Sequence, residues 1–135
     1  MKKVVLIMML SVIVWNLNAQ NNTKPKTGKP DIFFESPSFD FGTITEGTNV
    51  DMTFKFFNSG SAPLLIKNVK PACGCTGAEF PKEPIMPGKS GVIKASFSSA
   101  GFKGQNVHKS ITVTTNIDDN GSDKVVVIYL KGFVK

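Results

Sequence analysis

VDMTFKF, at residues 50–56, alternates strictly between apolar and polar side chains. Successive side chains of a β-strand point to opposite faces, so a period of two is typical of a strand that buries one face and exposes the other. The stretch therefore predicts a half-buried strand. Its expected apolar face consists of Val50, Met52, Phe54 and Phe56. The sequence NSGS at 58–61 follows, and residues of these types favour a turn.

Similar short patterns recur along the rest of the chain, and no stretch outside the N-terminal region shows sustained helical periodicity. Turn-forming residues separate them, notably Pro87-Gly88 and the sequence DDNG at 118–121, where Asn-Gly favours a tight hairpin. Further strands are expected at 32–34, 39–41, 64–70, 91–98, 111–116 and 124–134. These signals predict an all-β fold, an antiparallel β-sandwich of six to eight short strands, with an open barrel as the lesser alternative.

Three of these segments carry finer expectations. The segment 39–41 follows Pro37, which is typical of an edge strand with a break. In 64–70, alternation places Leu64, Ile66, Asn68 and Lys70 on one face and Leu65, Lys67 and Val69 on the other. The segment 124–134 has apolar residues on both faces, so we expect a central strand that is covered on both faces for part of its length.

Residues 1–19 have the features of a secretion signal. Two lysines precede an apolar run from Val4 to Trp15, and Ala19 supplies the small residue of a cleavage site. The run is shorter than the roughly 20 apolar residues of a membrane span, so no span is expected after cleavage. We expect an exported protein of a bacterial cell envelope, periplasmic or extracellular. Its expected parts are a signal peptide at 1–19, a flexible polar linker at 20–30 and one domain at 31–135.

The charge of the chain argues against a nucleic-acid partner. The formal net charge is +6, but every basic residue is a lysine and none is an arginine. Arginine is the preferred side chain for phosphate groups and base edges. The lysines are also scattered rather than gathered in one segment, which favours a solvated lysine surface.

The only two cysteines stand one residue apart, in the sequence Cys73-Gly74-Cys75-Thr76. Outside the cytoplasm such a pair can form a disulfide, take part in a metal site or exchange with other thiols. In a fully extended backbone, the Cα atoms of Cys73 and Cys75 would lie near or beyond the largest separation that a disulfide can span. Gly74 allows a bend that brings the two sulfurs together. So small a ring constrains the unfolded chain very little, which makes global stability an improbable purpose. The residues leave these alternatives open.

Other chemistry has few candidate residues. A copper or zinc site at Cys73 and Cys75 needs further donors, and His108, the only histidine, is the candidate third ligand. The cysteine spacing differs from that of thioredoxin-like motifs. Glu79 and Glu83 flank prolines in an expected loop, and no nucleophile motif or phosphate-binding loop is present. We therefore expect no catalytic residues, no cofactor and no enzymatic activity.

Several segments together resemble a bacterial exported family of unknown function whose hallmark is the Cys-Gly-Cys-Thr sequence found here at 73–76. The matching segments cover about 100 residues in order: FDFGTI at 39–44, Gly47, IMPG at 85–88, Phe97, Gly104, ITVTTN at 111–116 and LKG at 130–132. That family is similar to immunoglobulin-like domains of the abnormal-spindle/hydin and major-sperm-protein type. The resemblance implies an immunoglobulin-like sandwich of seven to eight strands with no established catalytic activity.

Two hypotheses of function follow. The first is an exported, non-enzymatic immunoglobulin-like domain that contacts an unknown protein or cell-envelope partner through a sheet edge or loops. The alternative is a thiol-redox or metal-binding module for copper or zinc. It would use the loop of Cys73 and Cys75, with His108 as a further donor.

Overall fold

The computed structural model describes residues 28–116 and 122–135, and every regular element in them is a β-strand. The strands are β1 (Ile32–Phe34), β2 (Ser38–Ile44), β3 (Asn49–Asn58), β4 (Ile66–Pro71), β5 (Thr76–Glu79), β6 (Ser90–Ser98), β7 (Gln105–Thr115) and β8 (Lys124–Val134). All strands that the sequence predicts are present. β5 was not predicted, because its residues TGAE show no apolar alternation.

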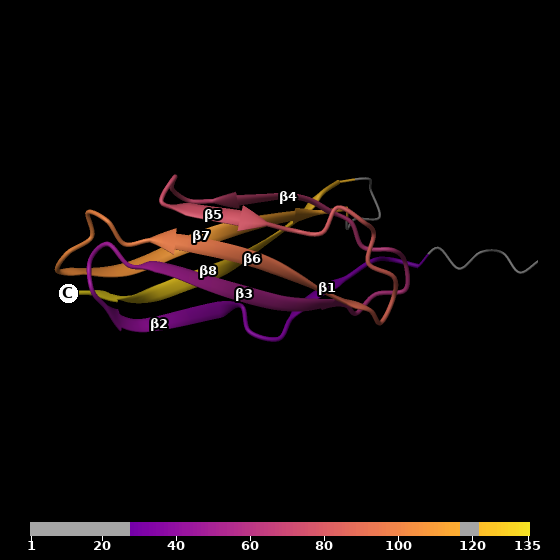
Figure 1. Ribbon diagram of the computed structural model, residues 1–135. Helices are drawn as coiled ribbons and strands as arrows, with labels where there is room; N and C mark the ends of the chain where they lie inside the picture. The colour runs from indigo at the N-terminus through magenta and orange to yellow at the C-terminus, as the bar shows by residue number, and fades with distance from the viewer. Residues whose placement is uncertain (1–27, 117–121) are drawn as a thin grey trace, which may run out of the picture.

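The strands form two four-stranded sheets that pack as a sandwich (Figure 1). The first sheet has the order β1-β3-β6-β5 and the second has the order β2-β8-β7-β4. The predicted all-β, immunoglobulin-like sandwich is confirmed, but it is not purely antiparallel, since β2 and β8 pair in parallel. The chain passes at Pro37 from an edge of the first sheet to an edge of the second without turning back (Figure 1). This crossing produces the parallel pair and confirms the predicted edge strand.

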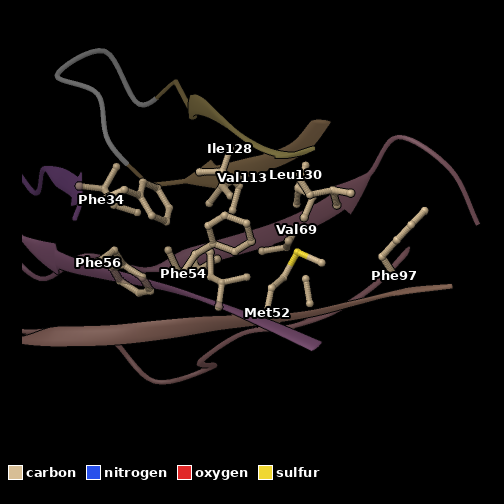
Figure 2. Close-up of a cluster of buried hydrophobic side chains, with 14 of the residues drawn as sticks. Phe34, Met52, Phe54, Phe56, Val69, Phe97, Val113, Ile128 and Leu130 are labelled. Carbon is tan, nitrogen blue, oxygen red and sulfur yellow. The ribbon is translucent and has the colours of Figure 1, made fainter. Parts of the chain in front are cut away.

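The core lies between the inner faces of the two sheets (Figure 2). Met52, Phe54 and Phe56 of β3 are buried as predicted, while Val50 at the end of the sandwich is half-buried. The inner face of the second sheet is fully buried at these positions: Ile111, Val113, Ile128, Leu130 and Val134. Burying one such side chain contributes about 1.5–3 kcal/mol, so the alternation that predicts the strands also supplies most of the stability.

Asn58 is a fully buried polar side chain at the end of β3. Its Nδ2 donates to the carbonyl oxygens of Ala62 (2.7 Å) and Ile85 (2.9 Å). Its Oδ1 accepts from the backbone N–H groups of Gly60 (2.9 Å) and Asp31 (3.2 Å). The amide thereby ties three connecting segments together and is itself satisfied, as burial of a polar group requires.

β4 contains a bulge that the sequence pattern does not reveal. The register with β7 shifts between Ile66 and Asn68, so Lys67 is an extra residue. Ile66 and Val69 are therefore both buried, and Asn68 is exposed. The expectation that Ile66 and Asn68 share one face is wrong, because one extra residue inverts the alternation after it.

β8 is a central strand, between β2 and β7, as predicted, but only one of its faces is covered. Ile128 and Leu130 are fully buried, whereas Val125 and Tyr129 on the other face are 56% and 38% exposed. The expectation of cover on both faces is wrong, because the sandwich has two layers and the outer face of each sheet faces solvent.

Some predictions concern residues outside the described ranges. These are the signal peptide at 1–19, the linker up to residue 27 and the Asn-Gly turn. Residues 28–30, assigned to the linker, contact the domain, since the N–H of Ser61 donates to the carbonyl oxygen of Lys29 (2.7 Å). β7 and β8 pair antiparallel up to Thr115 and Lys124, as expected for a hairpin. The described part of the chain has no helix long and apolar enough to cross a membrane.

Candidate functional site

The loop of residues 72–75 connects the edge strand of one sheet to the edge strand of the other (Figure 1). β4 ends before it in the second sheet, and β5 begins after it in the first. Three backbone hydrogen bonds fix the loop: Ala72 N–H to Ser110 O (2.9 Å), Thr76 N–H to Cys73 O (3.3 Å) and Ser98 N–H to Cys75 O (2.9 Å). The loop is thus held by β7 on one side and by β6 on the other.

Cys73 and Cys75 are joined by a disulfide, with their Cα atoms 5.3 Å apart. Both side chains are half-buried, and Cys75 packs against the margin of the core. The Sγ of Cys75 lies 3.9 Å from the Oγ1 of Thr76, which is buried. Gly74 lies in the turn without a positive φ, and a Cβ there would meet nothing within 4 Å. The expected bend is present, but neither backbone strain nor crowding requires a glycine at this position.

His108 does not join the cysteines in a metal site. Its side chain is exposed on the outer face of β7, where the ring stacks on Tyr129 with centroids 5.3 Å apart and planes 10° apart. Within residues 28–116 and 122–135, no three histidine, cysteine, aspartate or glutamate side chains gather as a metal-binding group. The three residues proposed for copper or zinc therefore do not form a closed site in this chain.

β5 is an edge strand of the first sheet and pairs with β6 without a register shift. Backbone groups along an antiparallel strand face its two sides in alternation. Ser98 donates to Cys75, so Gly77 and Glu79 also bond to β6. The N–H and C=O of Ala78 consequently point away from the sheet. We call the outward backbone groups of residues 76–80 the β5 edge.

The edge of β4 carries three features that discourage further strand pairing. It has the bulge at Lys67, and Lys67 and Lys70 are both exposed on it. Because Ala72 bonds to β7, alternation places the backbone nitrogen of Pro71 on the outward side, where a proline offers no N–H. Bulges, lysines and prolines are the usual protection of exposed edges.

The two remaining edges are also protected. β2 has a register shift between Asp40 and Thr43, with Gly42 between them at a φ of +68°. The carboxylate of Asp40 accepts the N–H of Gly42 (2.8 Å) and stabilises this bulge. β1 has only three residues and lies between Pro30 and Pro37. Among the described edges, β5 and β1 have a regular register and no lysine or proline within the strand, and β5 is the longer of the two, with four residues against three.

A shallow hollow of 520 Å³, which we call the β5 hollow, lies on the outer face of the first sheet beside this edge. It forms where Gly77 has no side chain and where the neighbouring residue on β6 is the small Ser96. Its charged lining residues are Asp51, Glu79 and Lys94. In the part of the chain that the structure describes, these three side chains form no ion pair and no hydrogen bond.

The sequence interpretation missed most of this surface. Glu79, expected in a loop, is the last residue of β5, and Gly77, Ala78 and Asp51 were not identified. Asp51 was one of several polar residues in an alternating strand, with nothing to distinguish it. The residues of the β5 hollow come from three strands, and only the order β3-β6-β5 brings them together. The one local sequence feature that relates to the β5 hollow is Gly77, directly after the Cys-Gly-Cys-Thr sequence.

Comparison with known proteins gives a family and a fold. Residues 32–134 match the family described as "Protein of unknown function (DUF1573)", a range that includes every strand of the sandwich. No match was found among the curated proteins.

Solved structures share the fold at low sequence identity. A protein of unknown function from Porphyromonas gingivalis W83 is 18% identical, with a TM-score of 0.60 over 78% of this chain and 46% of that one. This chain thus spans about half of its length. The human CEP192 ASH/PapD-like domain is 10% identical, with a TM-score of 0.59 over 79% of this chain and 87% of that one. WR4, an MSP family member of C. elegans, is 11% identical, with a TM-score of 0.52 over 79% and 98%.

These likenesses establish the fold alone. They confirm the expected similarity to domains of the major-sperm-protein type. Other matching structures include a chaperone and a protease, so the fold does not decide between binding and catalysis.

Proposed function

We propose that this chain, which belongs to the family described as "Protein of unknown function (DUF1573)", is an exported, non-enzymatic binding domain. It pairs with an extended segment of an envelope protein through the β5 edge. The observation that carries this proposal is the outward N–H and C=O of Ala78 on the longest described edge strand without a bulge, lysine or proline.

An extended segment is the partner that such an edge fits best. One added strand would pair with both outward groups of Ala78, with the C=O of Thr76 and with the N–H of Phe80. Each such hydrogen bond contributes a net of about 0.5–1.5 kcal/mol, which gives weak binding from the backbone alone. Side chains of the segment must therefore contribute to affinity and specificity.

Two features support an exported setting. The N-terminal residues have the charge, apolar run and small residue of a secretion signal. The Cys73–Cys75 disulfide is also of a kind that persists in oxidising compartments.

The test is capture of a partner from an envelope extract of the producing cells, with the full chain as bait. Ala78→Pro removes the outward N–H and leaves the ladder to β6 intact, because the N–H of Ala78 does not face β6. Ala78→Ser keeps the N–H and is the matched control. We expect a protein that the wild type and Ala78→Ser retain and Ala78→Pro does not.

A second variant that blocks the β5 edge ensures that the result does not depend on whether Ala78→Pro folds. Ala78→Lys places an inward-pointing charge on the same edge, a device by which natural edges avoid pairing. Thermal melts of all variants establish that they are folded. Equal retention of the same proteins by the wild type and both blocked variants would refute the proposal.

Thiol–disulfide exchange is the second candidate function, favoured by the half-exposed disulfide. In such an exchange a partner dithiol reduces the Cys73–Cys75 bond to two thiols and is itself oxidised to a disulfide. Intact mass with and without a thiol-alkylating reagent, before and after incubation with a reduced dithiol protein, follows this step. A bond that remains closed while the dithiol stays reduced would exclude it.

A further inference from the structure

The β5 hollow restricts which side chains an added strand can place beside it. A residue opposite Ala78 points inward, toward the margin of the core, where Ala78 is itself half-buried. The residues on either side of it point outward and stand opposite Gly77 and Glu79. The chemistry of these two outward positions decides the partner.

The carboxylates at the hollow are unengaged, unlike several others on the described surface. Three carboxylates elsewhere form ion pairs with lysines, Asp31 with Lys124, Glu35 with Lys55 and Asp123 with Lys67. Asp51 and Glu79 form none within the described residues. A positively charged side chain of a partner could therefore interact with Asp51 and Glu79 without first displacing a lysine from an existing ion pair.

Strand register arranges the lining of the hollow in two rows across the sheet. Gly77, Ser96 and Asp51 form one row, and Glu79, Lys94 and Thr53 form the next. Lys94 is thus a direct neighbour of Glu79, while the row of Asp51 contains no cation and no large side chain. That row is an open path from the β5 edge to a carboxylate.

We propose that the partner segment carries two basic side chains at alternate positions, opposite Gly77 and opposite Glu79, with an apolar residue between them opposite Ala78. The first basic side chain lies over Gly77 and Ser96 toward Asp51. Asp51 is three strand spacings, about 14 Å, from the added backbone, so even an extended lysine or arginine crosses only about half of this distance and is attracted to Asp51 across the hollow without forming a direct ion pair. The second forms a cross-strand ion pair with Glu79.

A second copy of this chain is not the expected occupant. The only lysine-x-lysine sequence in the chain is Lys24-Pro25-Lys26. Pro25 would stand opposite Ala78, where the added strand has to donate an N–H, and a proline has none. The segment is therefore expected on a different polypeptide. This inference rests on the proposed pairing at the β5 edge and names the chemistry of that partner.

The experiment is selection of random twelve-residue peptides, displayed on yeast, by the immobilised full chain. Three variants are used beside the wild type. Ala78→Pro blocks the edge, and Asp51→Asn/Glu79→Gln removes the two carboxylates of the hollow. Glu35→Gln/Glu83→Gln removes two carboxylates outside it and controls for net charge. Melting curves confirm that each variant is folded.

We expect the wild type to enrich peptides with lysine or arginine at alternate positions, and Ala78→Pro to enrich none of them. Asp51→Asn/Glu79→Gln should weaken a selected peptide roughly 2- to 5-fold, about the range for one exposed ion pair with Glu79 together with the longer-range attraction of Asp51, and the control should weaken it less than twofold. Peptides that require the edge but show no alternate basic residues, or that bind the two double variants equally, would overturn this inference alone. Enrichment that is the same for wild type and Ala78→Pro would overturn the proposed function as well.

Discussion

Ser98 donates its backbone N–H to the carbonyl oxygen of Cys75 at 2.9 Å. This bond fastens the disulfide loop to β6 directly before β5 begins. It also sets the alternation by which Gly77 and Glu79 face β6 and Ala78 faces outward. The Cys-Gly-Cys sequence thus lies where it orients the longest edge strand that has no bulge, lysine or proline.

The disulfide should matter more to this local arrangement than to global stability. For Cys73→Ser/Cys75→Ser we expect a loss of about 1.5 kcal/mol or less in the free energy of unfolding, because the closed ring contains only three residues. Urea unfolding measures it. Hydrogen exchange at the N–H of Ser98 should become faster in the same variant. A loss above about 3 kcal/mol would mean that the disulfide is a major structural crosslink.

Two glycine substitutions should have opposite outcomes. A Cβ on Gly132 would overlap the ring of Phe41 and lie 2.7 Å from the carbonyl oxygen of Gly42, whereas one on Gly74 meets nothing within 4 Å. We expect Gly132→Ala to cost about 1–3 kcal/mol through overpacking and Gly74→Ala to change stability by less than about 0.5 kcal/mol. Thermal or urea unfolding compares them. Equal effects would contradict the packing of β2 on β8.

Removal of the buried amide at Asn58 should be strongly destabilising. Asn58→Ala leaves the carbonyl oxygens of Ala62 and Ile85 and the N–H groups of Gly60 and Asp31 without this partner. Several unsatisfied groups in a buried site predict a loss of roughly 2–4 kcal/mol, measured by urea unfolding. A change below about 1 kcal/mol would show that water replaces the amide without difficulty.

Acid should weaken one ion pair at the entrance to β1. The hydrogen bond from Lys124 lowers the pKa of Asp31 below its ordinary value of 3.8. The contribution of the Asp31–Lys124 pair to the free energy of unfolding is therefore fully present above pH 3.8 and is lost as the pH falls through the lowered pKa of Asp31. Since the pair is exposed, Lys124→Met should cost less than about 1 kcal/mol at neutral pH, and the difference from wild type should vanish once the pH is below the lowered pKa of Asp31. A difference that persists in acid would contradict this assignment.

The sequence predicts much of the fold because strand alternation and turn residues are local signals. Residues 50–56 show a period of two, and Met52, Phe54 and Phe56 of their expected face are buried. The bulge at Lys67 escaped prediction because an extra residue is visible only against the partner strand. The exposure of Val125 and Tyr129 escaped it because valine and tyrosine favour strands on either face of a sheet.

The candidate site was predictable only in part. The sequence identifies the paired cysteines and the bend between them, but not the neighbouring edge. β5 has four residues with a glycine among them, which is too short and too irregular for a pattern. Asp51 reaches the same surface through two strand pairings that join segments distant in the chain.

Amide hydrogen exchange of the full chain, alone and bound to its captured partner, tests the central claim most directly. In the free protein, the N–H of Ala78 should exchange faster than those of Gly77 and Glu79, which bond to β6. Binding should slow exchange at Ala78 and Phe80 and leave the edges of β2 and β4 unchanged. Unchanged exchange at Ala78 in the complex, with new protection on another edge or loop, would contradict the account.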